Sequence, residues 1–551
     1  MFGGWIPYLG HALTFGKDYA ALLEECAKKS NSNVFTIFIA GQRMTFVISP
    51  HDCSTVLRES KRLQFHPIGC QVMKDAFDCQ LNPHAPAYVK WDEQSPKQWG
   101  MLRGASLTRL LSKTLPELSA AIDAYPELST NRPEYKNNNN NNSNGSFTEC
   151  TSLYTLVTNL IWTSTSNSLY GDLSRDGGKH LNDVRDSFIK YDSYFPLLLA
   201  GIPAKMLPGC QQASDHLRGL FTTPLSGKPS ELLDFRHNFL LENMPTEAAL
   251  SFQHAFVWAV FANTIPAAFW SLFWILRDPG CQEEVLKEVR SAFGSDASLD
   301  DEQRALKLAQ HLHAQVHGGG AVDASVQEEV NVAVLNILEK LPLLDSIIFE
   351  SLRLCIGSLT IRRAKEAFTL KLKDKTACKI RQADRVVIAP VMTHMDPEIY
   401  PDPKSFQRTR FLDPAAAKTK NIAPGEPHSK SSQAVRNSRV TNPRIVRMKS
   451  GVNVPASIAL QPFGGGESMC PGRHFAVGEI KLFIALILLK WEIKLSGDKS
   501  ETQESGQGSE DHVNLSSVGV PALDLTRAGL GILPPVPTDL VTCRFRARNK
   551  E

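Results

Sequence analysis

One stretch limits the possible folds of this chain more than any other: FVWAVFANTIPAAFWSLFWIL, from Phe256 to Leu276. Its 21 residues carry no formal charge and are numerous enough to cross a membrane as a helix. An amide, a hydroxyl and a proline (Asn263, Thr264 and Pro266) lie together near its middle, which makes a poor lipid-facing helix. The stretch therefore favours a helix buried inside a large protein, with a membrane span as the alternative.

The flanking residues predict where this helix begins and ends. Thr246 can cap its start. Pro279 cannot continue a helix and also restricts Asp278 before it, so we expect the helix to end at Arg277. Pro266 removes a backbone donor and is expected to distort the helix locally.

The composition excludes several other classes of protein. Of 551 residues, 42% are hydrophobic and 21% are charged, which is typical of a globular protein. The net charge of +3 is too small to indicate a nucleic-acid partner. The 11 cysteines form no CxxC pair, which argues against a zinc or disulfide framework. No signal or anchor segment is visible at the N-terminus.

The periodicity of the remaining chain is mainly helical. The exception is a predicted β-hairpin, with strands at Val34–Ile39 and Met44–Ile48 around a turn at 40–43. Apolar residues recur at helical spacing in four examples, which are Trp99–Leu111, Leu286–Phe293, Val334–Leu354 and Phe475–Lys490.

Three polar inserts interrupt this pattern, at about residues 137–146, 415–458 and 496–518. The first is asparagine-rich and the third is rich in Gly, Ser and Glu, so both are expected to be loops. The middle insert has eight Lys and Arg residues against one acid, Glu426. It is interpreted as a solvated loop or, alternatively, as a docking patch for an acidic partner.

The motif that carries the most chemistry is PFGGGESMCPGRHFA, near the C-terminus. Cys470 follows three glycines, which let a backbone turn tightly against a large flat ligand. A helix is expected to start at about His474, and its first N–H groups lower the pKa of a nearby thiol. A thiolate ligand for haem iron is presented in this way. The alternative is a buried structural cysteine beside a turn.

The pattern Phe463-x-x-Gly466-x-x-x-Cys470-x-Gly472 resembles the haem-binding loop of the cytochrome P450 superfamily. The resemblance implies a single catalytic domain over residues 1–551. It also implies a mainly α fold with small β-sheets, and haem b between the long central helix and the loop, with its iron ligated by the Cys470 thiolate.

Further residues match the family pattern in the same order. Glu350 and Arg353 share a helix face within an apolar segment, and by resemblance Arg410 completes a buried structural triad with them. Arg362 is similar to a family arginine that binds a haem propionate, with Arg363 as the alternative.

Two further positions concern the same propionates. Trp99-x-x-x-Arg103 resembles a family helix that also meets them. Ser468 is a departure, because the family often has an arginine at that position.

The centre of the apolar stretch matches the place where the family carries an acid followed by threonine. By resemblance, the hydroxyl of Thr264 handles protons during the cleavage of dioxygen beside the haem. Asn263 replaces the acid and can only orient water, because an amide has no titratable proton. The pair is nevertheless similar to the pattern of one branch, the sterol 7α-hydroxylases.

Several other segments resemble the cholesterol and 24-hydroxycholesterol enzymes of that branch, among them Met395–Pro403 and Arg527–Pro535. A sterol needs a long apolar pocket with few polar contacts. The candidate walls, each of which has ordinary core packing as its alternative, are Trp258, Phe261, Ala262, Pro266 and Leu530. The apolar segment Tyr194–Leu207 lies over the substrate entrance by resemblance, and it is interpreted as a membrane contact.

The resemblance therefore implies a monooxygenase that hydroxylates a sterol or oxysterol, with position 7α expected. It implies O₂, electrons from an NADPH-dependent flavoprotein reductase, a location at the cytosolic face of the endoplasmic reticulum membrane, and no nucleic acid. Two alternatives stay open. One is a prostacyclin-synthase-like isomerase of a lipid peroxide, which needs neither O₂ nor a reductase, and the other is a haem-binding protein without catalysis.

Overall fold

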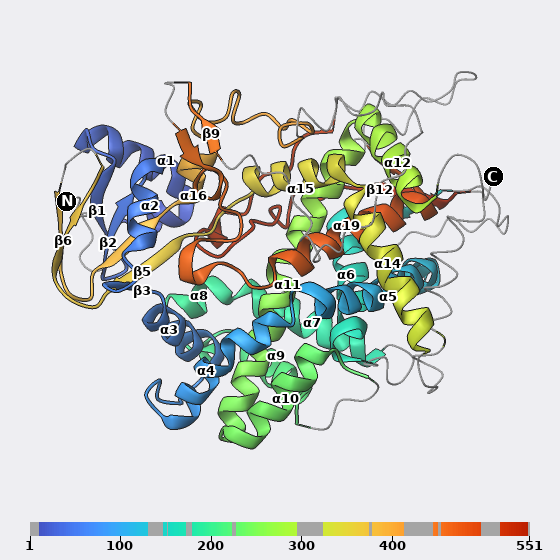
Figure 1. Ribbon diagram of the computed structural model, residues 1–551, viewed down its shortest axis with the longest axis horizontal. Helices are drawn as coiled ribbons and strands as arrows, with labels where there is room; N and C mark the ends of the chain where they lie inside the picture. Colours follow the sequence, from blue (N-terminus) through green and yellow to red (C-terminus); the bar gives the residue numbers. More distant parts are fainter. Residues whose placement is uncertain are drawn as a thin grey trace, which may run out of the picture.

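The computed structural model describes residues 10–130, 147–150, 152–171, 179–222, 228–294, 314, 323–373, 377–412, 445–449, 453–496 and 518–548. Helices dominate this part of the chain, and the sheets are small (Figure 1). One sheet lies beside the N-terminus, and strand β12 (Cys543–Ala547) lies toward the opposite end (Figure 1). The mainly α architecture with small β-sheets was predicted correctly.

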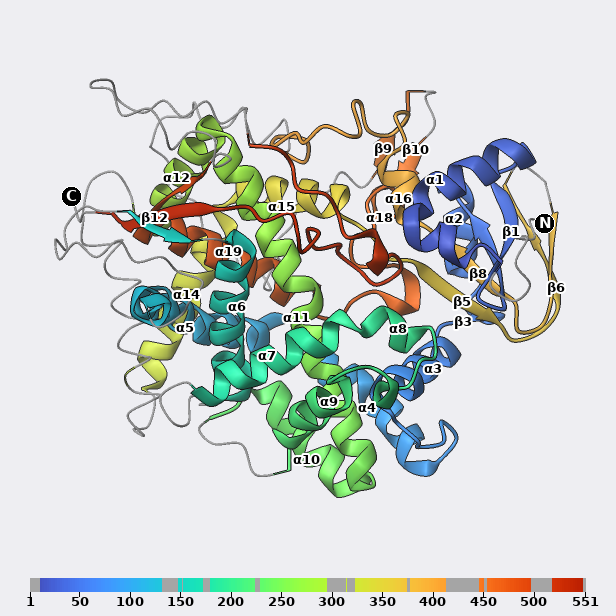
Figure 2. The ribbon, with the colours of Figure 1, turned by 180° about the vertical axis from the view of Figure 1, so that it is seen from behind.

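Helix α11 (Thr246–Arg277) contains the uncharged stretch and runs through the middle of the molecule (Figures 1 and 2). By length and composition it could cross a membrane, but 83% of its most apolar window is buried inside the protein. A helix covered on nearly all sides by other helices needs no charged face. Burial within the protein, as favoured from the sequence, therefore accounts for the missing charges.

One expectation about α11, the cap at its start, was wrong. Thr246 is the first helical residue and not the cap, because Pro245 occupies the capping position and no side chain caps this end. The helix also continues without a break through Pro266. A proline can be accommodated here because neighbouring elements hold the helix on both sides of it.

The end of α11 was predicted correctly, at Arg277. Asp278 then caps the next helix, α12 (Pro279–Phe293), because its Oδ1 accepts the backbone N–H groups of Gly280 and Cys281 at 3.0 and 3.2 Å. Asp278 and Pro279 together thus end one helix and start another.

Four helices form the core with α11: α5 (Gly104–Thr130), α6 (Leu153–Tyr170), α15 (Pro342–Leu354) and α19 (Arg473–Lys490). Helices α6, α15 and α19 pack on α11, and α5 packs on α6 and α19. Their apolar side chains belong to one continuous cluster. In α19 every residue from Leu482 to Leu488 is fully buried. Because α19 begins directly after the Cys470 loop, this rigid core anchors the loop.

A five-stranded sheet lies near the N-terminus, in the order β1-β2-β8-β5-β3. These strands are β1 (Val34–Ile39), β2 (Gln42–Val47), β3 (Leu63–Gln64), β5 (Thr360–Ala364) and β8 (Arg385–Ile388). Strands β1 and β2 form the predicted hairpin around a two-residue turn, with φ of 45° at Ala40 and 72° at Gly41. The turn is shorter than predicted, so β2 starts at Gln42.

The remaining strands form three smaller sheets. The C-terminal sheet pairs β11 (Trp491–Leu495) with β12 and β12 with β4 (Thr148–Cys150). The other two sheets are two-stranded hairpins, β6 (Phe368–Lys371) with β7 (Ala377–Ile380) and β9 (Ile445–Arg447) with β10 (Asn453–Pro455).

Two predicted helices are each divided into two. The segment Trp99–Leu111 is broken after α4 (Pro86–Gly100), and Val334–Leu354 is broken between α14 (Ala324–Glu339) and α15. In the second case Pro342 explains the break, because it starts α15 and cannot continue α14.

Twelve further helices and 3-10 turns complete the part of the chain that the structure describes: α1 (Ala12–Ser30), α2 (Pro50–Arg58), α3 (His66–Phe77), α7 (Lys179–Ser193), α8 (Phe195–Leu199), η1 (Ala204–Met206), α9 (Cys210–Gly219), α10 (Glu231–Asn243), α16 (Pro390–His394), α18 (Ala456–Ala459), η3 (Gly466–Ser468) and η6 (Leu525–Arg527).

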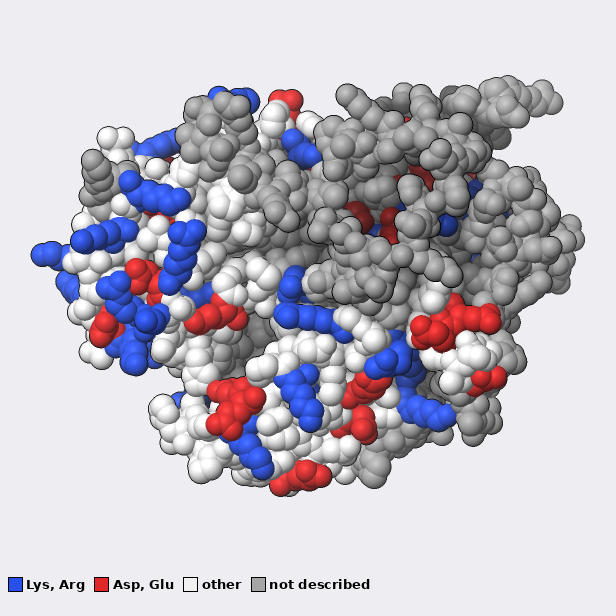
Figure 3. Space-filling view, viewed as in Figure 1, with Lys and Arg blue, Asp and Glu red and all other residues white. Residues whose placement is uncertain are grey.

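The polar inserts lie mostly outside the described residues. This holds for residues 137–146 and 497–517, and for most of 415–458, where β9, β10 and α18 are described. On the face seen in Figure 3, basic and acidic side chains of the described surface are interspersed. The proposed basic docking patch cannot be placed on it, because residues 413–444 are outside the described part.

Candidate active site

Cys470 lies in the loop between the 3-10 turn η3 (Gly466–Ser468) and α19. Its backbone N–H donates to the carbonyl oxygen of Phe463 at 2.9 Å, which closes the loop. Gly464 and Gly466 have φ of +72° and +60°, where other residues are strained. These glycines are therefore required by the backbone. The helix after the loop starts one residue before the predicted His474.

Two opposing effects act on the pKa of the Cys470 thiol. Burial raises the pKa of the Cys470 thiol, and the backbone N–H of Gly472, the Arg473 guanidinium and the Arg473 N–H oppose this rise. The helix start acts on the sulfur as predicted, but burial outweighs it. If Cys470 ligated a metal ion, its thiol would be deprotonated, and the N–H groups of Gly472 and Arg473 would stabilise the thiolate.

Arg362 on β5 is a buried cation beside this loop. It is 3% exposed, and its Nη2 donates to the carbonyl oxygen of Gly465 at 2.8 Å. Burial lowers its pKa, with Glu467 opposing. No carboxylate among the described residues forms an ion pair with it. A buried guanidinium without a counter-ion fits the carboxylate of a ligand.

The two observations together fit haem, whose iron accepts a thiolate ligand and whose propionates pair with a cation. Arg363, the alternative to Arg362, is exposed. It points to the opposite side of β5, because successive side chains of a strand alternate.

Trp99 and Arg103 do not share a helix, so that part of the prediction was wrong. Trp99 is the penultimate residue of α4, and Arg103 lies in the turn before α5. Arg103 lines a cavity of about 480 Å³ together with Phe463, Met469 and Arg473. It therefore lies on the same side as the Cys470 loop. The ring of Trp99 instead lies 5.7 Å from the guanidinium of Arg236.

The structure brings Glu350, Arg353 and Arg410 together. Glu350 and Arg353 are fully buried and form a two-bonded pair, in which Arg353 Nε and Nη2 each lie 2.8 Å from a Glu350 oxygen. Arg410 Nε and the backbone N–H of Gln407 reach Glu350 Oε1 at 2.9 and 3.1 Å. A buried carboxylate with this many donors is well compensated.

Backbone oxygens accept the remaining donors of the two arginines. Arg353 Nη1 donates to the carbonyls of His394 and Pro403 at 2.7 and 2.6 Å, and Arg410 Nη1 donates to that of Pro401 at 2.8 Å. The network therefore fixes the segment 394–405, which packs behind the cysteine loop. A second Glu–Arg pair with the same spacing, Glu59 and Arg62, is partly exposed and forms a surface ion pair.

His394 connects this network to the cysteine loop and was missed from the sequence. Its Nδ1 lies 3.2 Å from the carbonyl oxygen of Arg353, and its Nε2 accepts the N–H of Gln461 at 3.0 Å. Burial and the nearby Arg353 charge lower its pKa to about 3, so the ring is neutral. A single histidine at the end of the short helix α16 gives no sequence signal of this role, because its partners are backbone atoms.

Thr264 and Asn263 make different contacts on α11. The hydroxyl of Thr264 donates to the carbonyl oxygen of Val260 at 2.8 Å, which leaves its lone pairs to accept hydrogen bonds. The amide oxygen of Asn263 accepts the backbone N–H of Ile532 at 3.0 Å. Asn263 therefore joins the central helix to the C-terminal loop, a role not foreseen from the sequence.

The residues predicted to line the substrate pocket lie in different surroundings in the structure. Trp258 is half-buried, stacks on Phe195 with ring centres 3.8 Å apart, and donates through Nε1 to Asp192 Oδ1 at 2.8 Å. Arg527 holds the same carboxylate at 2.7 Å. Asp192, which sequence reasoning missed, thus ties α7, α11 and the C-terminal segment together.

Phe261 is a correction to the proposed pocket walls. It has no exposed surface, and its ring lies 4.2 Å from that of Trp162 and 5.7 Å from that of Phe188. It belongs to the core between α6, α7 and α11. Ala262 and Pro266 are buried, and Leu530 is half-buried in the C-terminal segment.

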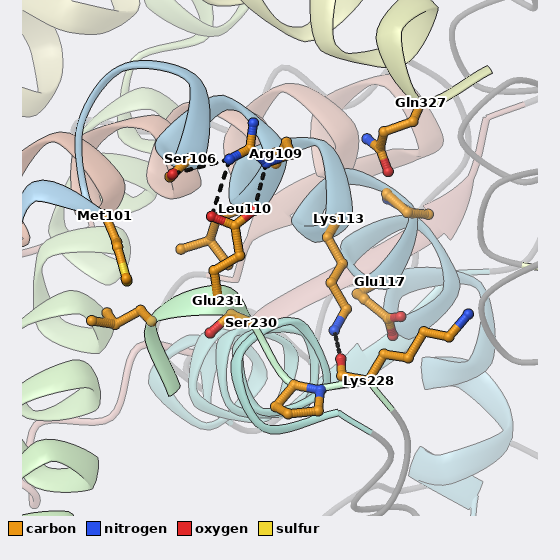
Figure 4. A pocket seen from close by; sticks show the side chains of 13 residues that line it. Met101, Ser106, Arg109, Leu110, Lys113, Glu117, Lys228, Ser230, Glu231 and Gln327 are labelled. Carbon is orange, nitrogen blue, oxygen red and sulfur yellow. Dashed lines mark hydrogen bonds and ion pairs between the residues drawn. The ribbon is translucent and has the colours of Figure 1, made fainter. Parts of the chain in front are cut away.

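A separate cavity of about 180 Å³ lies between α5 and the start of α10 (Figure 4). Its charged groups are satisfied by the protein: Arg109 pairs with Glu231 at 2.6 Å, and Lys113 donates to the carbonyl oxygen of Lys228. Burial lowers the pKa of Lys113 to about 8. These contacts hold α10 against α5 and give the cavity a structural role.

Comparisons with known proteins agree with this geometry. The family model described as Cytochrome P450 matches residues 306–514. The chain is 30% identical to cholesterol 7-alpha-monooxygenase of Cricetulus griseus, over 97% of this chain and 90% of that protein. It is 27% identical to cytochrome P450 7B1 of Mus musculus over 89% and 84%, and 26% identical to prostacyclin synthase of Bos taurus over 99% and 93%.

The glycine-rich cysteine loop and the buried ion network beside it define a haem-thiolate protein. The chain belongs to the cytochrome P450 family. The predicted family, fold class and class of enzyme, a cytochrome P450 monooxygenase, are confirmed. The family implies a haem iron with a thiolate ligand, and Cys470 provides the cysteine that the loop presents.

Proposed function

We propose that this protein hydroxylates a sterol or oxysterol at the 7α position with O₂ and two electrons. The observation that carries the proposal is the similarity to cholesterol 7-alpha-monooxygenase over 97% of the chain, which includes the Cys470 loop. The similarity to cytochrome P450 7B1 supports the same branch of the family.

The roles of the individual residues follow from their contacts. Haem, when bound, activates dioxygen and inserts one oxygen atom into a C–H bond. Cys470 would ligate the iron, and Phe463 and Gly466 shape the loop that presents it. Arg362, whose guanidinium is buried without a counter-ion, would bind a propionate. Trp99 and Arg103 remain candidates for the other propionate contacts.

Thr264 is proposed to manage protons at the active site. Its hydroxyl hydrogen is held by the Val260 carbonyl, so its oxygen can accept a hydrogen bond from water or from a proton donor. Asn263 carries no titratable proton, and its amide oxygen already holds the Ile532 N–H. Proton delivery through bound water is therefore proposed, with Thr264 as the ordering group.

The substrate is proposed to lie against α11, between Trp258, Ala262, Pro266 and Leu530. These side chains are apolar, which suits a sterol body. The Asp192–Trp258–Arg527 contacts fix the side of this region toward α7. We place Phe261 outside the pocket, in the core.

An NADPH-dependent flavoprotein reductase and the endoplasmic reticulum membrane are proposed as the partner and the location. Leu197 and Met206, on α8 and η1, are 41% and 73% exposed and present apolar surface from the segment Tyr194–Leu207. Exposed apolar side chains on a short helical segment fit contact with the surface of a membrane.

A second candidate function is the isomerisation of a lipid peroxide, which the similarity to prostacyclin synthase favours. That reaction would need neither NADPH nor O₂. The two functions are separated by turnover of the haem-loaded protein with cholesterol, 24-hydroxycholesterol and a prostaglandin endoperoxide, each with and without reductase and NADPH, and with products assigned by mass spectrometry and NMR.

The expected product is a 7α-hydroxylated sterol that forms only with reductase, NADPH and O₂. Rearrangement of the endoperoxide without NADPH, with no sterol product, would refute the proposal and favour the isomerase. Cys470→Ala is expected to abolish activity in both cases. An active Cys470→Ala protein would contradict every haem-thiolate function.

A further inference from the structure

A cavity of about 480 Å³ lies among α6, α7, α11 and the segment 524–541, apart from the cysteine loop. None of Cys470, Thr264 and Arg362 lines it. Its volume is within the roughly 300–1,000 Å³ of small-molecule sites. It is therefore large enough for a ligand of its own, separate from the haem site.

Part of the lining of this cavity is apolar. Phe269 and Ile265 of α11 and Phe188 of α7 line it. The ring of Tyr154, from α6, meets Phe269 edge to face with ring centres 5.3 Å apart. Aromatic and branched side chains of this kind make a surface for a rigid hydrocarbon body.

Two unused hydrogen-bonding groups also line the cavity, the hydroxyl of Tyr154 and one carboxylate oxygen of Asp192. The hydroxyl of Tyr154 makes no hydrogen bond to any described residue. The carboxylate of Asp192 receives both Arg527 and Trp258 through Oδ1, and Oδ2 has no protein donor among the described residues. Both groups can therefore bond to a hydroxyl group of a ligand.

The charges of the lining favour a ligand without negative charge. Four aspartates line the cavity (Asp186, Asp192, Asp524 and Asp539) against two arginines, Arg185 and Arg527. Both arginines are already paired, with Asp186 and Asp192 respectively. No unpaired cation lines the described cavity, so a carboxylate or sulfate would meet net repulsion.

We propose that this cavity is a second binding site, for a neutral amphipathic molecule of sterol size whose hydroxyl group bonds to Tyr154 and Asp192. The site goes beyond the proposed hydroxylation, because it lies away from the haem. It shares Asp192 with Trp258, so its occupant contacts the carboxylate that positions one wall of the substrate region. Binding there is expected to change the apparent KM for the substrate.

The rim of the cavity offers a way to block it without touching the catalytic residues. Ile189 and Leu540 line the rim and are 47% and 62% exposed. Ile189→Trp, on α7, and Leu540→Trp, in the C-terminal segment, each replace an aliphatic side chain at this opening with a larger indole ring. Leu241→Trp on α10 is the matched control, because Leu241 is 51% exposed and does not line the cavity.

The test measures the binding stoichiometry of haem-loaded protein. Tritiated 25-hydroxycholesterol is the probe in equilibrium dialysis, and the haem absorbance change is followed in parallel because it reports only the molecule beside the iron. Two molecules per haem are expected for the unchanged protein and for Leu241→Trp. One molecule per haem is expected for each rim variant, with the absorbance change retained.

Two further measurements test the polar contacts. Tyr154→Phe is expected to weaken the second site about fivefold, because one hydrogen bond is lost. Cholesterol sulfate, an anionic probe, is expected not to displace the second molecule of 25-hydroxycholesterol.

A stoichiometry of one for the unchanged protein would overturn the proposal, as would two molecules in both rim variants. Because this assay counts bound molecules and not products, its outcome is independent of the proposed reaction. A protein that binds two molecules without forming a 7α product would refute the hydroxylation and leave the second site standing.

Discussion

The amide oxygen of Asn263 on α11 holds the backbone N–H of Ile532 in the C-terminal loop at 3.0 Å. The preceding residue, Gly531, has φ of +147°, and a Cβ atom there would lie only 1.8 Å from the Asn263 oxygen. The asparagine and the glycine thus require each other. This contact gives Asn263 a structural role, for which only its acceptor oxygen is needed.

We expect Gly531→Ala to separate the C-terminal loop from α11. The methyl group cannot occupy the position of the Asn263 oxygen, and alanine is also strained at this φ. The catalytic efficiency kcat/KM for the sterol should fall at least about tenfold, which corresponds to about 1.4 kcal/mol. Steady-state kinetics measure this change, and haem content should stay near that of the unchanged protein.

Gly519→Ala is the matched control for that experiment. Gly519 lies in the same C-terminal segment, and a Cβ there meets nothing within 4 Å. Its kinetics should not change. Equal kcat/KM for Gly531→Ala and the unchanged protein would show that the loop is not held through this contact.

The buried carboxylate of Glu350 provides the second prediction. Glu350→Gln leaves two buried guanidinium groups, Arg353 and Arg410, without their negative partner. Breaking a buried pair in this way costs about 3–5 kcal/mol. We expect poor haem retention, seen as a small carbon monoxide difference spectrum, and a large fall in the free energy of unfolding.

The chain contains its own control for this change. Glu59 and Arg62 have the same spacing on the surface, with the side chains 26% and 38% exposed. Glu59→Gln should alter the free energy of unfolding by no more than about 1 kcal/mol. If both variants behaved alike, burial would not explain the importance of the triad.

The cysteine loop and the ion network were the parts most accessible from the sequence. Cys470 follows a run of glycines, and Glu350 and Arg353 lie in an apolar segment. The loop and the ion network can therefore be recognised from local sequence patterns. Asp192 and His394 were missed because their partners are distant in sequence or are backbone atoms. The break between Trp99 and Arg103 was also missed, since helical spacing continues across it.

The pKa of His394 leads to the third prediction. The ring is neutral in the folded protein, with a pKa of about 3 against an ordinary value of 6.5. Below pH 6.5 the unfolded chain binds the extra proton, so this histidine's contribution to stability is present above that pH and is lost as pH falls toward 3. Glutamine does not titrate, so His394→Gln removes this dependence of stability on pH.

Urea titrations between about pH 7 and pH 5 measure the effect. His394→Gln should be the less stable protein at neutral pH, because it loses its contacts with Arg353 and Gln461. Its deficit in unfolding free energy should narrow by about 1.4 kcal/mol per pH unit below 6.5. His84→Gln, at an exposed position, is the control. A deficit that stays constant over this range would contradict the neutral, buried state of the ring.

The last prediction concerns the hydroxyl of Thr264. Thr264→Ala removes the group that orders water, while the apolar surroundings that bind a sterol remain. We expect NADPH consumption to continue at a similar rate while product formed per NADPH falls at least about fivefold, because a proton-transfer contribution of roughly 10²–10⁴ is being weakened. Thr264→Ser keeps a hydroxyl that can donate to the Val260 carbonyl and should retain most of the coupling. NADPH oxidation and 7α product are measured in the same reaction, so equal coupling in Thr264→Ala and Thr264→Ser would remove Thr264 from the proton path and leave bound water or another donor to supply it.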